Sequence, residues 1–168
     1  MARMKCIDAA TLARLSADAA ASPRRRKNLN LHLSHDDAVQ RMCNAFEPGT
    51  YVAPHRHPGR NPFELFVVLT GEAALLRFDD RGQVLERVVL RAGGPIYAIE
   101  LPASDWHTVV SLASGTVLFE VKAGPYVPVT DKDFAPWAPR EGETACAVFE
   151  TWYRSAQPGD VPPPHAPG

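Results

Sequence analysis

GTYVAPHRHPGRNPFELFVVLTG, residues 49–71, holds two histidines and a glutamate that together decide the interpretation of the chain. His55 and His57 are two positions apart, and Glu64 follows seven positions after His57. If the residues before position 58 form a strand, both imidazoles project from one face. If residues 63–70 form the returning strand, Glu64 lies near the hairpin end, where cross-strand Cβ atoms are about 4.5–5.5 Å apart. Two imidazoles and a carboxylate converging from an antiparallel pair predict a divalent-metal site that lacks its last ligand.

His107 is the remaining ligand that we predict. It lies at the start of a predicted strand, 50 residues beyond His57, and shares a face with Val109 and Ser111. A histidine in this position can also be an ordinary core residue, but the two histidines and the glutamate upstream favour a ligand. Neutral imidazoles and a carboxylate suit Zn, Fe, Mn or Ni, and the absence of thiolates argues against a closed structural zinc site. We therefore predict one divalent ion held by His55, His57, Glu64 and His107.

Short predicted strands separated by glycine and proline turns fill the middle of the chain. Residues 39–46 fit a helix or a strand by pattern alone, and the Glu47-Pro48-Gly49 turn that follows favours a strand. Gly82, in the hairpin turn DDRGQ, is expected to have a positive φ. This spacing predicts an all-β sandwich or barrel. The other predicted strands are 27–33, 63–70, 73–78, 84–90, 96–100, 106–112 and 116–122.

The two ends of the chain differ from this β-rich middle. Residues 8–21 are Ala-rich and predict a short helix with Asp8 as its N-cap, and the basic run 24–27 is interpreted as a solvated helix end. Nine of the 16 prolines lie from Pro125 onward, which predicts an extended wrap, with a short helix or strand near 144–153. We divide the chain into an N-terminal helix (1–22), a barrel domain with its wrap (23–154) and a Pro-rich tail (155–168) that is not expected to pack.

Composition excludes several classes of protein. The 168 residues carry a net charge of −1, which argues against a nucleic-acid surface or a polybasic membrane patch. No stretch approaches the roughly 20 apolar residues of a spanning helix, and no signal peptide is evident at the start, so we expect a cytoplasmic protein. The three cysteines are far apart and form no CxxC motif, and we interpret them as reduced thiols.

The two histidine regions resemble the motifs of the cupin superfamily of double-stranded β-helix, or jelly-roll, barrels. Gly49, His55, His57, Glu64 and Gly71 fit the first motif, G(x)5HxH(x)3–4E(x)6G, except that six residues separate His57 from Glu64. The extra residues fall within 58–62, where a longer hairpin tip accommodates them. In the second motif Pro102 and His107 fit, while Ser104 and Ser111 replace a glycine and an asparagine. The resemblance implies a cupin barrel with a metal site.

A narrower resemblance extends over nearly the whole chain. NLNLH, VQRM, PGTYVAPHRH, FDDRG, DWHT, FEVKAGPY and FAPWAPREG look like the WbuC family of cupin-fold metalloproteins. That family is associated with bacterial O-antigen and surface-polysaccharide gene clusters. The resemblance therefore implies a role in polysaccharide biosynthesis, and cupins are often homodimers, which we expect here.

Several polar side chains are candidates for work beside the metal. Glu120 and Lys122 share a face of one predicted strand, either as a solvated pair or as an acid/base pair in the cavity, where burial would bring the Lys122 pKa towards neutrality. Tyr51 is placed on the face of His55 and His57 as a third catalytic candidate. Asn28, Asn30 and His32 form a polar row that either faces water or lines the cavity to bind substrate, and Phe66 shares the face of Glu64.

Three functions remain open from the sequence. The first is a metal-dependent enzyme that isomerises or epimerises a small polar substrate, such as a sugar or nucleotide sugar. The second is an Fe(II) dioxygenase that uses the same ligands. The third is a non-catalytic module in which the metal and polar row bind a ligand. The fold alone does not separate them, because function depends on the site.

Overall fold

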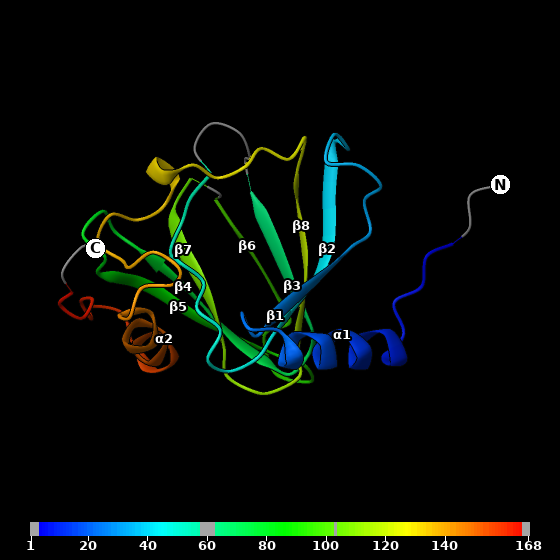
Figure 1. The fold of residues 1–168 in the computed structure, drawn as a ribbon, viewed down its shortest axis with the longest axis horizontal. Helices are drawn as coiled ribbons and strands as arrows, with labels where there is room; N and C mark the ends of the chain where they lie inside the picture. The colour runs from blue at the N-terminus through cyan, green and yellow to red at the C-terminus, as the bar shows by residue number, and fades with distance from the viewer. Residues whose placement is uncertain (1–3, 58–62, 103, 166–168) are drawn as a thin grey trace.

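Two antiparallel sheets face one another in the computed structural model, which describes residues 4–57, 63–102 and 104–165 (Figure 1). The five-stranded sheet has the order β1-β2-β8-β3-β6, and the three-stranded sheet has the order β5-β4-β7. This arrangement confirms the predicted all-β jelly roll. The strands are β1 Arg26–Asn30, β2 Val39–Phe46, β3 Glu64–Thr70, β4 Glu72–Phe78, β5 Val84–Arg91, β6 Ala98–Leu101, β7 Trp106–Ser111 and β8 Thr116–Ala123.

The space between the sheets is apolar over part of its length and polar over the rest. Strand alternation sends Phe66, Val68 and Leu118 inward from the large sheet, where they meet Leu75 and Val109 from the small one. Further along the same strands the inward positions carry Glu64, Glu120 and Lys122. The apolar part closes the barrel, and the polar part is left for a site.

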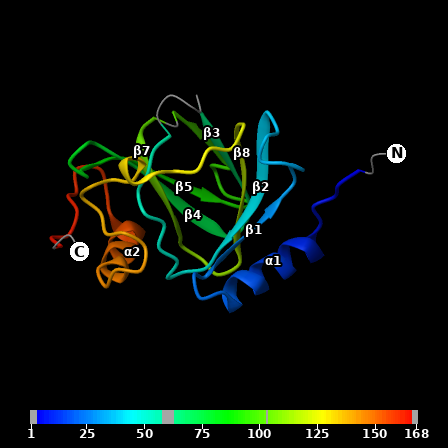
Figure 2. The same cartoon turned by 45° about the horizontal axis from the view of Figure 1, so that its top comes forward.

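Helix α1, Ala9–Ala21, covers the outer face of the five-stranded sheet (Figure 2). Leu15 and Ala19 are buried against Cys43, Ala45 and Val117 of the sheet. As predicted, Asp8 caps the helix, accepting a hydrogen bond from the Thr11 N–H at 2.8 Å. This helix therefore buries apolar residues on the outer face of β2 and β8.

Helix α2, Cys146–Ser155, and the C-terminal wrap cover the outer face of the three-stranded sheet. Phe149 and Tyr153 are fully buried against strand residues such as Leu76 and Phe78. The predicted element near 144–153 is therefore a helix. A short 3-10 helix, η1 (Asp131–Asp133), interrupts the wrap before it reaches α2.

The Pro-rich tail packs, contrary to the prediction. The Gly159 N–H donates to the Val84 carbonyl at 2.8 Å, and the Val84 N–H donates to the Asp160 carbonyl at 2.9 Å. The ring of His165 lies 5.1 Å from that of Phe149, centroid to centroid. The free edge of β5 supplies unpaired backbone groups, and the tail satisfies them, which its composition does not reveal.

One predicted strand has different bounds in the structure, and another is irregular and pairs with a different neighbour. The N-terminal strand begins one residue earlier than expected, at Arg26, and ends three residues earlier, at Asn30. The segment before residue 58 is irregular, with isolated bridges from His55 to His107 of β7 and to Phe134, so it pairs with β7 rather than with β3. The chain therefore changes sheets between His57 and Glu64, and the hairpin tip predicted at 58–62 lies outside the described residues. No helix in the described part of the chain is long and apolar enough to span a membrane.

Candidate metal centre

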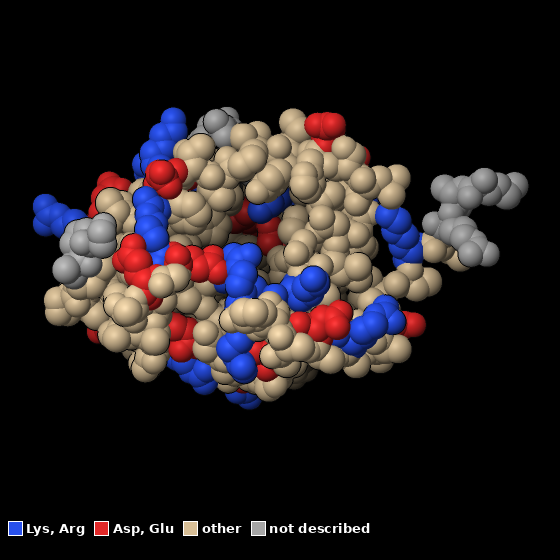
Figure 3. Space-filling view, in the orientation of Figure 1, with Lys and Arg blue, Asp and Glu red and all other residues tan. Residues whose placement is uncertain are grey.

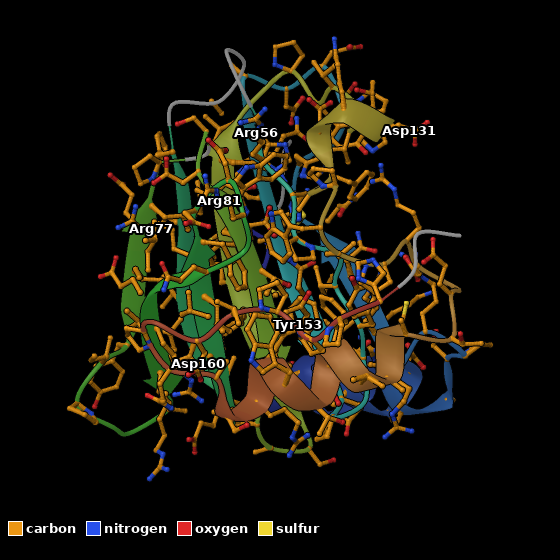
Figure 4. The ribbon with its side chains drawn as sticks, turned by 90° about the vertical axis from the view of Figure 1, so that its left-hand side faces the viewer. Arg56, Arg77, Arg81, Asp131, Tyr153 and Asp160 are labelled. Carbon is orange, nitrogen blue, oxygen red and sulfur yellow. The ribbon has the colours of Figure 1, made fainter. Side chains whose placement is uncertain are left out.

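Four side chains from three segments of the chain meet at one end of the barrel. His55 and His57 come from the irregular segment, Glu64 is the first residue of β3, and His107 is the second residue of β7. One ligand atom from each residue lies within 4.8 Å of all the others. Arg56, between the first two histidines, marks this end of the barrel in Figure 4, and Tyr153 of α2 lies towards the other end. The structure thus brings together all four predicted ligands, from both sheets.

Backbone pairing positions two of the histidines. His55 and His107 exchange N–H···O=C hydrogen bonds of 3.0 and 3.1 Å, so their side chains leave one short stretch of ladder. The His55 Nδ1 lies 3.0 Å from the Ala53 carbonyl oxygen, and the His107 Nδ1 lies 2.8 Å from that of Asp105. Since a carbonyl only accepts, each Nδ1 carries the proton. Each Nε2 is therefore left to face the cluster, as in a metal-ligating histidine.

The contacts of Glu64 fit a shared cation. Its Oε2 lies 2.8 Å from His107 Nε2, and its Oε1 lies 3.2 Å from His57 Nε2. With His107 in its neutral form, protonated at Nδ1, its Nε2 and the carboxylate are two facing acceptors. Two ligand atoms that each lie about 2.0–2.2 Å from the same ion are separated from one another by distances like these two. A divalent metal among the four residues resolves this conflict, so the residues present fit the group that the spacing predicts.

When no metal is bound, protons on the histidines supply the positive charge that faces Glu64. Burial lowers the pKa of His107, but the hydrogen bond and the charge of Glu64, together with the Asp105 carbonyl, outweigh burial and raise that pKa. Burial alone would raise the pKa of Glu64, but the hydrogen bonds with His107 and His57 hold it well below its usual range. Burial lowers the pKa of His55 to about 3, assisted by repulsion from His107, so this imidazole stays neutral and ready to ligate.

Lys122 and Glu120 lie directly beside the cluster, as a buried pair. The Lys122 Nζ is 3.1 Å from Glu64 Oε1 and 2.6 Å from Glu120 Oε1, and the Asn44 amide donates to Glu120 Oε2 at 2.6 Å. Strand register explains the contacts, because Lys122 pairs with Glu64 across β3 and β8. The predicted fall of the Lys122 pKa is wrong: burial lowers it, but the charges of Glu120 and Glu64 outweigh burial and raise it. Lys122 is therefore an ammonium that donates.

The structure places Tyr51 away from the cluster. Its hydroxyl donates to the Pro139 carbonyl at 2.7 Å, and its ring stacks on that of Tyr153, 6.0 Å away, in the core beneath α2. The prediction that Tyr51 shares a face with the histidines requires a regular strand through residues 51–57. The chain is irregular there, so the two-residue alternation does not extend from Tyr51 to His55. Phe66 does point inward, but into the apolar part of the barrel.

The three residues of the predicted polar row, Asn28, Asn30 and His32, lie in different environments. Asn28 lines a surface pocket with Met42 and Asn44 of β2, and it donates to the Asn30 side chain at 2.7 Å. Asn30 is exposed. His32 is buried, with its Nδ1 3.1 Å from the Arg41 N–H and 3.0 Å from the Arg41 carbonyl, so it extends the β1–β2 pairing. Of the three, Asn28 lines this pocket near the barrel mouth.

A hollow opens between β1–β2 and the segment that carries His55. Figure 3 shows it as a depression with acidic and basic atoms at its floor. His55 lines a cavity of about 400 Å³ here, together with Val52, Ala53 and Phe134. Residues 125–129 line a smaller pocket with His57 and Lys122, and they cross the end of the barrel in Figure 2. The segment 125–129 therefore lies over the site. Trp137, further along the wrap, packs outside the barrel on Phe78.

Three arginines at this mouth are functional candidates that the sequence patterns do not single out. Arg24, Arg26 and Arg140 line the cavity that His55 also lines. The basic run 24–27 predicts only a solvated helix end. However, β1 begins at Arg26, which shares the inward face of Asn28, so the early start of this strand turns the guanidinium towards the mouth. Alternation counted back from Asn28 is the signal that could have identified Arg26.

Two facing sheets with a His-His-Glu-His cluster between them define a cupin fold. Similar solved structures include TT1209 from Thermus thermophilus, which is 23% identical, with 71% of this chain and 97% of that one covered and a TM-score of 0.50. An RmlC-like cupin protein from Desulfovibrio desulfuricans is 19% identical, with 63% and 88% covered and a TM-score of 0.47. KdgF from Halomonas sp. is 18% identical, with 64% and 82% covered and a TM-score of 0.46.

The chain belongs to the family described as domain of unknown function (DUF6016), which matches residues 7–90. That segment is half of the sequence and includes His55, His57 and Glu64. No curated protein matches the chain. The family therefore leaves the chemistry open, and it has to be inferred from the site.

Proposed function

We propose that the protein is a metal-dependent enzyme that isomerises or epimerises a small polar substrate, with one divalent ion bound by His55, His57, Glu64 and His107. The observation that carries the proposal is the convergence of four ligand atoms within 4.8 Å, beside a buried ammonium–carboxylate pair. A site built only to hold a metal has no need of that pair. A bound ion would act as a Lewis acid that polarises a substrate oxygen.

Lys122 and Glu120 supply the proton chemistry in this proposal. The Lys122 ammonium hydrogen-bonds the substrate oxygen and stabilises negative charge that develops there. The Glu120 carboxylate takes the proton from the neighbouring carbon and returns it to the adjacent carbon in an isomerisation, or to the opposite face of the same carbon after the planar intermediate turns over in the site. Asn44, bonded to Glu120 at 2.6 Å, orients the carboxylate for both transfers. Burial keeps competing water away from these groups, since Glu120 is only 7% exposed.

The polar residues near the mouth suit a sugar or nucleotide sugar. Asn28 and Asn44 line its outer pocket and offer amide groups to hydroxyls. The resemblance to the WbuC family supports a substrate from surface-polysaccharide biosynthesis. We also retain the expectation of a homodimer, which the molecular mass in solution would test.

Deuterium exchange tests the proposed reaction directly. Metal-loaded protein is incubated in D2O with nucleotide sugars and free sugars, and NMR follows loss of the proton next to the carbonyl carbon or at the epimerised carbon. We expect exchange with at least one substrate, and its loss in Glu120→Gln. The exposed variant Glu86→Gln is the matched control, because Glu86 pairs with Arg77 on the surface.

The same samples identify the competing functions. Iron in the purified protein together with substrate-dependent oxygen uptake would indicate the dioxygenase. Tight sugar binding in a thermal-shift assay, with neither exchange nor oxygen uptake, would indicate the non-catalytic binding module. Either result would contradict the proposed isomerase.

A further inference from the structure

Two arginines converge on one carboxylate at the mouth of the barrel. Arg24 donates to both oxygens of Glu141, from Nε at 2.5 Å and from Nη2 at 2.7 Å. Arg26 donates to the same carboxylate from Nη2 at 2.8 Å. A planar guanidinium fork is the geometry with which proteins recognise carboxylate and phosphate groups. The mouth therefore already holds one anionic group in a two-arginine clasp.

The clasp and the metal centre share one cavity. Arg24, Arg26, Arg140 and Glu141 line the cavity of about 400 Å³ that reaches His55, and its apolar walls include Val52 and Phe134. Basic groups outnumber acidic ones around this cavity, whose acidic side chains are Glu141 and Asp131. A molecule with its reacting end near the histidines would place its other end beside the arginines.

Arg26 and Arg140 are held in place by groups other than Glu141, whereas the printed side-chain partner of Arg24 is Glu141 itself. Arg26 donates from Nη1 to the Tyr51 carbonyl, and its side chain is only 19% exposed. Arg140 donates to the Asp131 carbonyl at 2.8 Å and stacks over the Phe134 ring, 5.0 Å from its centroid. The Arg140 Nη1 is buried and has no hydrogen-bond partner among the described residues. Arg26 and Arg140 therefore keep these contacts at the cavity wall when Glu141 leaves.

Glu141 itself is the easily displaced member. Its side chain is 43% exposed and that of Arg24 is 59% exposed, so water screens their pairing and competes for it. A ligand anion that brings further contacts deeper in the cavity has an advantage over this carboxylate. An internal carboxylate that leaves on binding also keeps the basic mouth neutralised in the free protein.

From these contacts we infer that Arg24, Arg26 and Arg140 form an anion subsite for the carboxylate or phosphate of a substrate whose other end reaches the metal centre. Glu141 occupies this subsite in the free protein and is displaced by the ligand. The inference rests on the proposed function for the identity of the reacting end, and it narrows the substrate class to a sugar acid or a nucleotide sugar.

Calorimetric titration with three probes tests the subsite: glucuronate carries a carboxylate, UDP-glucose carries phosphates, and glucose is neutral. We expect at least one anionic probe to bind more tightly than glucose, and Arg24→Gln and Arg140→Gln each to weaken it about tenfold. Glu141→Gln should tighten the same probe, because it removes the competing carboxylate. The probe that responds shows whether the anion is a carboxylate or a phosphate.

The pair Arg91 and Glu72 supplies matched controls, since Arg91 Nη2 lies 2.7 Å from Glu72 Oε2 at an exposed position elsewhere. Arg91→Gln and Glu72→Gln should leave probe binding unchanged. If Glu141→Gln weakens anion binding or leaves it unchanged, or if both arginine variants bind like wild type, the inference is overturned and Glu141 merely fastens the wrap to β1. Repeating the titrations on metal-free protein separates the two proposals, because the arginine dependence persists even if the metal-dependent reaction fails.

Discussion

The Lys122 ammonium lies 3.1 Å from the Glu64 carboxylate, so the only predicted anionic ligand of the metal is also paired with a buried cation. Strand register creates this contact, because the two residues are directly opposite on β8 and β3. Lys122 also bonds Glu120, and it therefore separates two carboxylates that would otherwise repel one another. The cation is needed most when no metal is bound.

Lys122→Met tests that role in stability. The side chain is 12% exposed, and its removal leaves two buried carboxylates without their common partner. We expect the free energy of unfolding of the metal-free protein to fall by about 3–5 kcal/mol, measured by urea denaturation with a chelator present. The double variant Lys122→Met/Glu120→Gln should recover part of the loss. Equal stabilities of the single and double variants would contradict this account.

The histidine ligands are tested by metal content. His57→Ala and His107→Ala each remove one imidazole from the cluster, so we expect the bound metal to fall from one ion per chain towards none after dialysis. Elemental analysis of the purified proteins provides the measurement. His35→Ala is the control, because His35 is exposed and lies in the turn before β2. If both site variants retained a full ion, the assignment of the centre would be wrong.

Gly71 joins β3 to β4 in a position that only glycine fits. Its φ is +73°, and a Cβ atom there would lie 2.4 Å from Thr116 Oγ1 and 2.7 Å from the Thr116 Cα. We expect Gly71→Ala to destabilise the fold by about 3 kcal/mol or more, from the backbone strain and the overlap together.

Gly93→Ala separates the cost of backbone strain from the cost of steric overlap. Gly93 has a φ of +75°, but nothing lies within 4 Å of the added Cβ. The substitution should cost only the strain, about 1–2 kcal/mol in the same chemical denaturation measurement. Similar losses at the two glycines would show that the overlap with Thr116 relaxes.

Phe149 tests whether α2 belongs to the core. Its side chain is fully buried between the helix and the three-stranded sheet, whereas the neighbouring Val148 is 56% exposed. Phe149→Ala should lower the free energy of unfolding by about 3–5 kcal/mol, and Val148→Ala should change it by less than about 0.5 kcal/mol. Comparable midpoints of thermal unfolding for the two variants would place α2 outside the cooperative unit.

The residues of the candidate metal centre are predictable from the sequence because their signal is a short motif. The spacing of His55, His57 and Glu64 identifies the cluster, although the segment with the two histidines is irregular and not the predicted strand. The pairing of Glu120 with Lys122 follows from two-residue alternation along a strand. Alternation fails where the chain is irregular, which is why it places Tyr51 with the histidines although Tyr51 lies beneath α2.

Other features depend on contacts between distant segments. The arginine clasp requires Glu141, 115 residues after Arg26 in the chain, to return to the start of β1. The tail packs because the edge of β5 offers unpaired backbone groups at Val84. The pKa of Lys122 rises because two carboxylates outweigh burial, a balance that depends on distances. None of these follows from composition or periodicity.

His55 and His107 each donate from Nδ1 to the carbonyl of the residue two positions earlier, Ala53 and Asp105. The orientation of each ring is thus encoded within three consecutive residues and does not rely on side chains from the rest of the barrel. Substitutions in the apolar interior or on either covering helix can accumulate while both imidazoles keep their aim. A centre of this kind can pass between proteins whose cores, and whose reactions, have diverged completely.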